Sequence, residues 1–228
     1  MRFAFPSLGL RVVALAVSFA AMAATLFFFS PTPAKAAGED VRRLSAEIAV
    51  LNADARRMAA KGLSPLHRRG VQARLRGGLA VLPLLIGAAR NDDAALPGLA
   101  AGRVGQILSA LDADDGTALI DALSVLGAAY RFDTSGLLPP DNRPQALSRA
   151  KRLHQAYCAA CHDDPDLQVS RPAWNLFALA RKIPPAELAA RLVIGVRGDS
   201  LTGLDNPLRN AEISALIAFY RKDTAAGN

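Results

Sequence analysis

Cysteine, methionine and aromatic residues are scarce in this chain. Among its 228 residues there are two cysteines, three methionines and one tryptophan, and aromatic side chains make up 6%. Two cysteines cannot build a disulfide framework across the fold, and they form one local pair, Cys158 and Cys161. No methionine follows Met58. The hydrophobic content of 51% is nevertheless enough to fill a core, which excludes a disordered chain.

The sequence also lacks the pattern of a nucleic-acid-binding protein, although its formal net charge is +7. Its basic residues are interspersed with acidic ones, and no aromatic residues lie between them to stack on bases. Removal of residues 1–36 leaves 24 basic and 20 acidic residues, a net charge of +4. We therefore expect a mixed surface and no nucleic-acid partner.

The first 36 residues have the pattern of an export signal. Arg2 and Arg11 precede an apolar run from Val12 to Phe29, and Ala34-Lys35-Ala36 then provides a small-residue cleavage site. Because the run approaches the ~20 residues that cross a bilayer, an uncleaved N-terminal anchor is the alternative. Both readings predict a periplasmic location for the rest of the chain, and only the second adds membrane contact.

Apolar residues recur every three or four positions after residue 40, which predicts an all-α fold. An N-terminal helical array is expected over residues 40–131, serving as a scaffold or docking region. Its expected helices are Asp40–Gly62, Ser64 to about Arg90, Val104–Leu111 and Leu119–Tyr130.

Several local signals accompany these helices. Ser64 and Thr117 are the expected N-caps of the second and fourth helices. Gly77-Gly78 and Pro83 are expected to kink the second helix. Its apolar run Leu79–Ile86 is too short to span a membrane.

Residues 132–145 are rich in proline and glycine, so we expect a linker there. A second helical unit then covers residues 146–222, and residues 223–228 form a tail. Its expected helices are Ala146–Tyr157, one that begins near Pro184-Pro185, and Ala211–Arg221, with Asn210 as the cap of the last. A proline-bearing loop is expected between the cysteine pair and Pro184.

Cys158, Cys161 and His162 form a C-x-x-C-H motif directly after one of these helices. The spacing places two thiols about one helical turn apart, as covalent attachment to the two haem vinyl groups requires, and holds His162 beside the iron as an axial ligand. A redox dithiol would need a βαβ context, and zinc would need further ligands such as His67, His154 or carboxylates. The motif, the export signal and the helical context favour one covalently bound haem c.

Residues 146 to about 221 resemble the class I mono-haem c-type cytochromes. The resemblance rests on the helix Leu147–Tyr157 that runs into the motif and on the final helix with Phe219-Tyr220-Arg221. It implies that the first and last helices of the unit cross beside the haem and that the Pro172 carbonyl orients His162. It also implies a haem pocket, for which the candidates are Arg171, Pro172, Trp174, Arg197, Leu201 and Tyr220.

The distal methionine that is usual in such cytochromes is missing. Leu201 stands approximately where that ligand is expected, and leucine cannot bind iron. The iron is then either five-coordinate and open to NO, CO or peroxide, or bound by another group. The other groups are His154, His67, Met58, a lysine, or a residue of the helical array or of another subunit.

The expected function is electron transfer in a periplasmic or membrane-surface redox chain. The additional helical array suggests a redox partner protein, since a free shuttle would not need it. The alternative is a haem protein whose open distal site binds or senses a small ligand. A peroxidase-like enzyme has less support, because no distal acid–base set is visible in the sequence.

Overall fold

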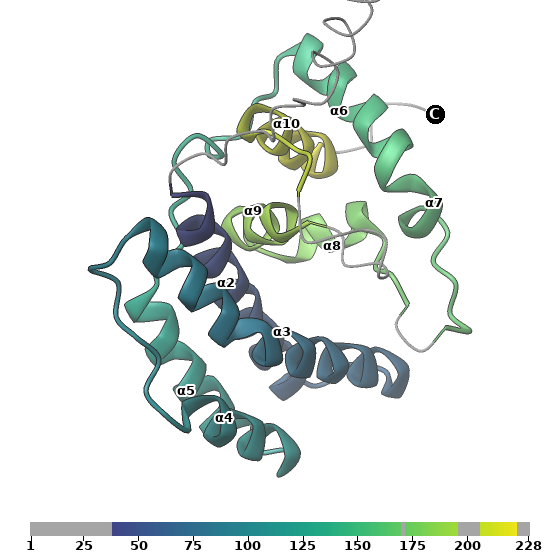
Figure 1. Cartoon of the computed structure of the whole chain (residues 1–228). Coiled ribbons are helices and arrows are strands. Elements are labelled where there is room, and N and C mark those ends of the chain that lie inside the picture. The colour runs from purple at the N-terminus through teal and green to yellow at the C-terminus, as the bar shows by residue number, and fades with distance from the viewer. Residues whose placement is uncertain (1–37, 170–171, 196–205, 223–228) are drawn as a thin grey trace, which may run out of the picture. The chain divides into compact units, whose positions relative to one another are not determined.

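The computed structural model describes residues 38–169, 172–195 and 206–222, and these ranges are all-α, as expected. The described helices are α2 (Glu39–Ala59), α3 (Pro65–Asp92), α4 (Arg103–Asp112), α5 (Gly116–Ala129), α6 (Pro144–Tyr157), α7 (Ala159–His162), α8 (Leu176–Lys182), α9 (Pro185–Ile194) and α10 (Asn210–Arg221) (Figure 1). Residues 37–228 form one compact unit. The expected export signal or anchor and the tail 223–228 lie outside the described residues.

Two helix starts in the N-terminal array depend on side-chain caps. Ser64 caps α3 as expected, because its Oγ accepts a hydrogen bond from the backbone N–H of His67 at 3.3 Å. The expected cap of α5 was wrong. Asp115 Oδ1, rather than Thr117, accepts from the N–H of Ala118 at 3.0 Å, and α5 begins one residue earlier than Thr117.

The C-terminal half contains a helix that the sequence patterns did not predict. Helix α8 lies within the expected proline-bearing loop and is capped by Asn175, whose Oδ1 accepts from Ala178 N at 2.9 Å. In α10, Asn210 is the first helical residue and not its cap. The residue before the helix is Arg209, and its backbone N–H donates to Glu212 Oε2 at 2.9 Å.

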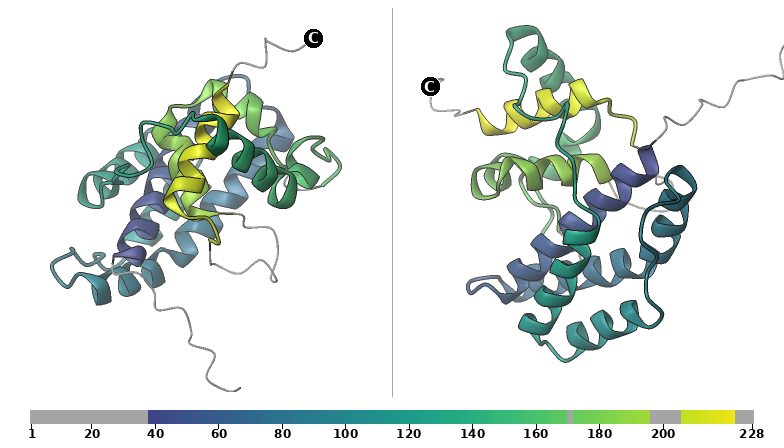
Figure 2. Two further views of the ribbon diagram at one scale, coloured as in Figure 1. Left: turned by 90° about the horizontal axis from the view of Figure 1, so that it is seen from above. Right: turned by 90° about the vertical axis from the view of Figure 1, so that its left-hand side faces the viewer.

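The first hydrophobic core is built by α2, α3, α4 and α5, which Figure 2 shows grouped together. Helix α2 contributes the stripe that its helical spacing predicts. The members of that stripe are Leu44, Ile48, Leu51, Ala55 and Met58. The remaining helices add further leucines, isoleucines and alanines, and Tyr130 lies at the end of α5.

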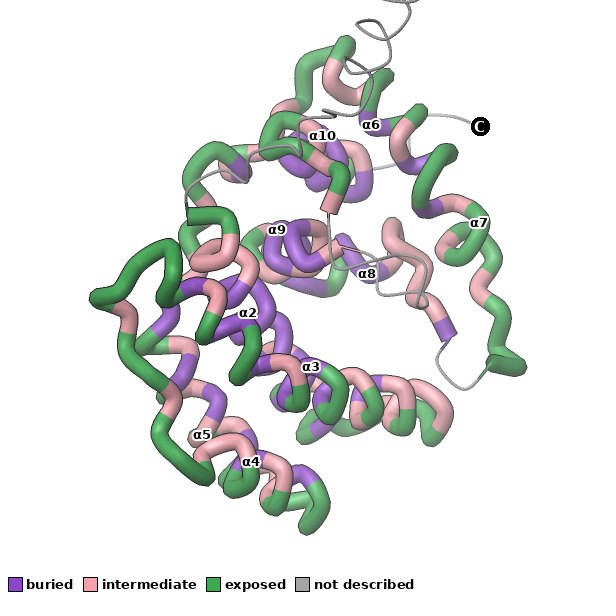
Figure 3. Tube along the Cα trace, in the orientation of Figure 1, coloured by how far each residue is buried: buried purple, intermediate pink, exposed green. Residues whose placement is uncertain are grey.

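The second core is built by α6, α8, α9 and α10, together with Leu137 of the expected linker. Two residues of α2, Ala46 and Val50, also belong to it. Helix α2 therefore buries residues on two sides, and the buried positions along it are purple in Figure 3. Because both cores use α2, the N-terminal array and the segment with the cysteine motif are packed together along this helix.

Helix α3 is 28 residues long and contains an 18-residue stretch that is apolar enough to cross a membrane by composition. The conclusion drawn from Leu79–Ile86, that no segment after residue 36 is long enough to span a membrane, was therefore wrong, since the apolar stretch extends beyond that run. The helix itself continues through Pro83, in agreement with the expected range from Ser64 to about Arg90. About 39% of that stretch is buried. Leu75, Leu79 and Leu82 are fully buried in the first core, so part of the apolar character of α3 is used in packing.

The close contact between α2 and α3 requires glycine at position 78. A Cβ atom there would lie 2.5 Å from Glu47 Oε1 and 2.7 Å from Leu51 Cδ2. We expect Gly78→Ala to lower the free energy of unfolding by about 1–3 kcal/mol through overpacking. Gly77→Ala is the matched control, because a Cβ there meets nothing within 4 Å and alanine favours helix. Equal denaturant midpoints for the two variants would contradict the prediction.

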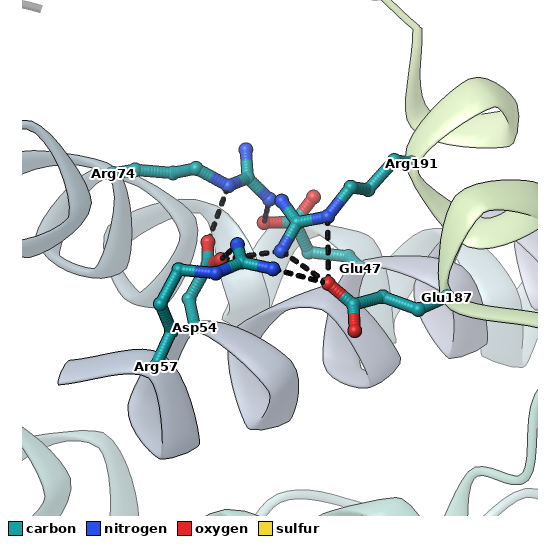
Figure 4. A network of polar contacts seen from close by, with 6 residues as sticks. All are labelled: Glu47, Asp54, Arg57, Arg74, Glu187 and Arg191. Atoms are coloured by element: carbon teal, nitrogen blue, oxygen red, sulfur yellow. Dashed lines mark hydrogen bonds and ion pairs between the residues drawn. The ribbon is translucent and has the colours of Figure 1, made fainter. Parts of the chain in front are cut away.

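A cluster of three arginines and three carboxylates joins α2, α3 and α9. Figure 4 shows its members, Glu47, Asp54, Arg57, Arg74, Glu187 and Arg191. Asp54 is at its centre and accepts from Arg74 Nε at 2.7 Å, Arg191 Nη2 at 2.5 Å and Arg57 Nη1 at 3.2 Å. Burial alone would lower the pKa of Arg191, but Asp54 and Glu187 raise it above its usual value. The network thereby holds α9 against the N-terminal array with its charges balanced.

Candidate functional site

The cysteine motif lies on a single helical turn that follows α6. The backbone N–H groups of Cys161 and His162 both donate to the carbonyl of Cys158, at 3.2 and 3.0 Å. Cys158 is buried, Cys161 is exposed, and both are free thiols. The turn therefore presents one thiol at the protein interior and one at the surface, with His162 directly after them.

The imidazole of His162 is oriented by a backbone carbonyl. Its Nδ1 lies 2.6 Å from the carbonyl oxygen of Trp174. Because a carbonyl can only accept, Nδ1 carries a proton, and in the neutral imidazole Nε2 then keeps its lone pair. A nitrogen in this state can bind a metal ion, and the hydrogen bond at the other ring nitrogen fixes the orientation of the imidazole.

This arrangement corrects the role expected of Pro172, whose carbonyl was predicted to orient His162. Pro172 is buried, and the hydrogen bond instead comes from the carbonyl two residues later. Trp174 directly precedes Asn175, the cap of α8, and Asn175 Nδ2 also donates to the carbonyl of Asp163 at 3.5 Å. The start of α8 is thus tied to the residue that follows His162, and this brings Trp174 to the imidazole.

A chain of polar contacts runs from Cys158 through the buried Tyr220 and His154 to the exposed Asp163. The thiol of Cys158 is hydrogen-bonded to the hydroxyl of Tyr220, which is also 3.0 Å from His154 Nδ1. His154 Nε2 is 2.9 Å from Asp163 Oδ1. In the tautomer with its proton on Nε2, His154 donates to Asp163 and accepts from Tyr220. His154 is therefore engaged at both ring nitrogens and is buried, with 4% of its surface exposed.

Burial raises the pKa of the Cys158 thiol, and the nearby Asp163 and Cys161 raise it further, although the hydrogen bond between Cys158 and Tyr220 opposes this. Burial also raises the pKa of Tyr220, with Cys158 as the next cause. An attacking thiol in a redox-active dithiol needs a lowered pKa, so this environment disfavours Cys158 in that role.

Aromatic side chains surround this polar chain. His154, Phe177, Phe219 and Tyr220 contact one another with ring centroids 5.2–5.7 Å apart. Phe177 and Phe219 are half-buried, whereas Tyr220 is fully buried. They leave apolar surface next to the residues that position Cys158.

The remaining candidate residues fall into three groups. Arg171, Arg197 and Leu201 lie outside the described residues. Met58 packs in the first core. His67 lies in the first turn of α3, and its ring centroid is also 4.3 Å from that of Trp174. Spacing along the sequence carried no signal for this contact between α3 and the segment before α8.

These residues fit a covalently attached haem on three counts. Two free thiols flank one turn, an imidazole beside them has a bare Nε2, and half-buried aromatic rings adjoin them. In the described ranges, no group of three or more histidine, cysteine, aspartate or glutamate side chains is arranged to hold a metal ion. Comparison of the chain with protein-family models, curated proteins and solved structures finds no significant match.

Proposed function

We propose that this chain carries one haem c, attached through Cys158 and Cys161 and ligated by His162, and that it transfers single electrons in the periplasm. The observation that carries the proposal is the C-x-x-C-H turn in which Nδ1 of His162 donates to a carbonyl and leaves Nε2 for iron. The pattern of residues 1–36 supports export to the periplasm.

The haem, when bound, supplies a one-electron couple between ferric and ferrous iron. The protein contributes the environment of that couple. His162 would ligate the iron, and its hydrogen bond to the Trp174 carbonyl would strengthen that ligation, which would favour the ferric state. A redox partner protein delivers the electron or receives it.

The packing of the helices also supports a likeness to class I cytochromes. Helices α6 and α10 pack against each other, as the resemblance implies for the first and last helices of such a domain. Tyr220 on α10 reaches Cys158 at the end of α6, so the contact between these helices extends to the attachment site.

A second candidate function is binding of a small ligand at an open distal face of the haem. Two observations favour it. His154 is engaged at both ring nitrogens, and Met58 is buried in the first core, so two of the residues considered as a sixth ligand have other roles. No methionine follows Met58 in the sequence.

Absorption spectra of the oxidised and reduced protein, with and without CO, distinguish the two functions. An electron carrier with six ligands is expected to show low-spin spectra that CO does not change. An open distal site is expected to bind CO rapidly in the ferrous state. A protein without any haem absorption after expression in cells that mature c-type cytochromes would contradict both functions.

Leu201→Met provides a second arm of this experiment. If residue 201 overlies the iron, a thioether there is expected to produce a low-spin spectrum and to abolish CO binding. Leu204→Met, three residues along, is the matched control. The same spectrum in both variants and in the natural protein would show that residue 201 does not overlie the iron.

A further inference from the structure

Trp174 connects the two halves of the described protein. Its carbonyl accepts from His162 Nδ1 at 2.6 Å, and its side chain contacts the N-terminal array. The ring of His67 on α3 lies 4.3 Å from the Trp174 ring, tilted by 37°. The guanidinium carbon of Arg57 on α2 lies 5.6 Å from the Trp174 ring centroid, within the range of a cation–π contact.

Both residues that touch the indole ring are themselves held in place. His67 Nδ1 lies 2.9 Å from the Oγ of Ser64, the cap of α3. Arg57 donates to Asp54 and to Glu187 Oε1, the latter at 2.9 Å. The indole ring is therefore held by side chains whose own positions are set by a helix start and by the charge network.

At Trp174, fixing the side chain also fixes the position of the backbone carbonyl. The indole ring and the carbonyl belong to the same residue in the short segment between Pro172 and α8. A ring that His67 and Arg57 hold restricts the rotation of this segment, and the carbonyl oxygen stays aimed at His162. Small rotations would lengthen the hydrogen bond and weaken His162 as a ligand to the haem iron.

We propose that Arg57 and His67 of the N-terminal array are positioning residues for His162, and that they act through the Trp174 carbonyl to set the reduction potential of the haem. The inference rests on the proposed ligation of haem iron by His162. It assigns the array a part in the redox site in addition to a scaffold or docking role.

The test is an equilibrium redox titration of full-length, haem-loaded His67→Ala, accompanied by electron paramagnetic resonance spectra of the ferric form. Loss of the ring contact is expected to weaken the Nδ1–H···O bond, destabilise ferric iron and raise the midpoint potential. His67→Phe keeps an aromatic ring on Trp174 and is expected to restore the potential and the spectrum towards those of the natural protein.

Two controls separate positioning from general stability. Val71→Ala removes buried volume from the first core on the same helix and is expected to lower the denaturation midpoint without moving the potential. Arg69→Ala changes an exposed residue two positions from His67 and is expected to change neither. An unchanged potential in His67→Ala, or an equal rise in Val71→Ala, would overturn this inference and leave the proposed function intact. A natural protein without covalent haem would overturn the proposed function and this inference with it.

Discussion

Haem is expected to remain on the polypeptide after denaturation and extraction with acidified acetone. Thioether bonds from Cys158 and Cys161 would be covalent, so unfolding of the surrounding helices would not release the group. The double variant Cys158→Ala/Cys161→Ala is expected to lose essentially all covalent haem when it is expressed in cells that mature c-type cytochromes. Mass measurement of the denatured chain, with haem absorbance of the acetone phase, reports both quantities.

Single variants refine this result. Cys161→Ala leaves the buried Cys158 as the one remaining thiol, and Cys158→Ala leaves the exposed Cys161. Each is expected to retain at most one thioether link. Ala160→Ser, a change at an exposed position between the two cysteines, is the matched control and is expected to keep a full haem complement. Free haem from the natural protein would refute covalent attachment.

Among single substitutions in the charge network, Asp54→Ala is expected to cause the largest loss of folding stability. The Asp54 side chain is 1% exposed and contacts three arginines, so its removal leaves those cations with only Glu47 and Glu187. Breaking one partner of such a buried network costs about 3–5 kcal/mol, because the uncompensated charges remain poorly solvated. Denaturant unfolding monitored by circular dichroism measures the change.

The matched control for this variant is Asp121→Ala. Asp121 is an exposed aspartate on α5, and a change there is expected to shift the free energy of unfolding by no more than about 0.5 kcal/mol. Asp54→Asn, which keeps the shape of the side chain, is expected to lie between the two. A loss below about 1 kcal/mol in Asp54→Ala would mean that the arginines find other partners or water.

The two faces of α2 illustrate how far sequence patterns reach. The stripe from Leu44 to Met58 follows helical spacing and correctly predicts a face in the first core. The second buried face has Ala46 and Val50 beside Glu47 and Asp54. Small and acidic residues on one face are typical of a solvent-facing surface, so the pattern gave no sign that α9 covers it.

The boundaries of the expected helices were predicted to within a few residues, but the residues that cap them were not always predicted correctly. Ser64 followed by Pro65 is a strong local signal, and α3 begins there. Thr117 was a plausible cap for α5, yet Asp115, another residue type that caps helices well, takes that role two positions earlier. Helix α8 was missed because it has seven residues, too few for a clear repeat of apolar positions.

Local sequence determined the all-α fold and the C-x-x-C-H motif, because helical spacing and the offset between two cysteines are properties of neighbouring residues. The carbonyl that orients His162 was decided by tertiary structure, since the cap of α8 brings Trp174 rather than Pro172 to the imidazole. The same holds for the contact of His67 and Arg57 with Trp174. Such contacts join residues about 110 positions apart, and the packing of α2 against the second core, with α3 beside α2, brings them within reach.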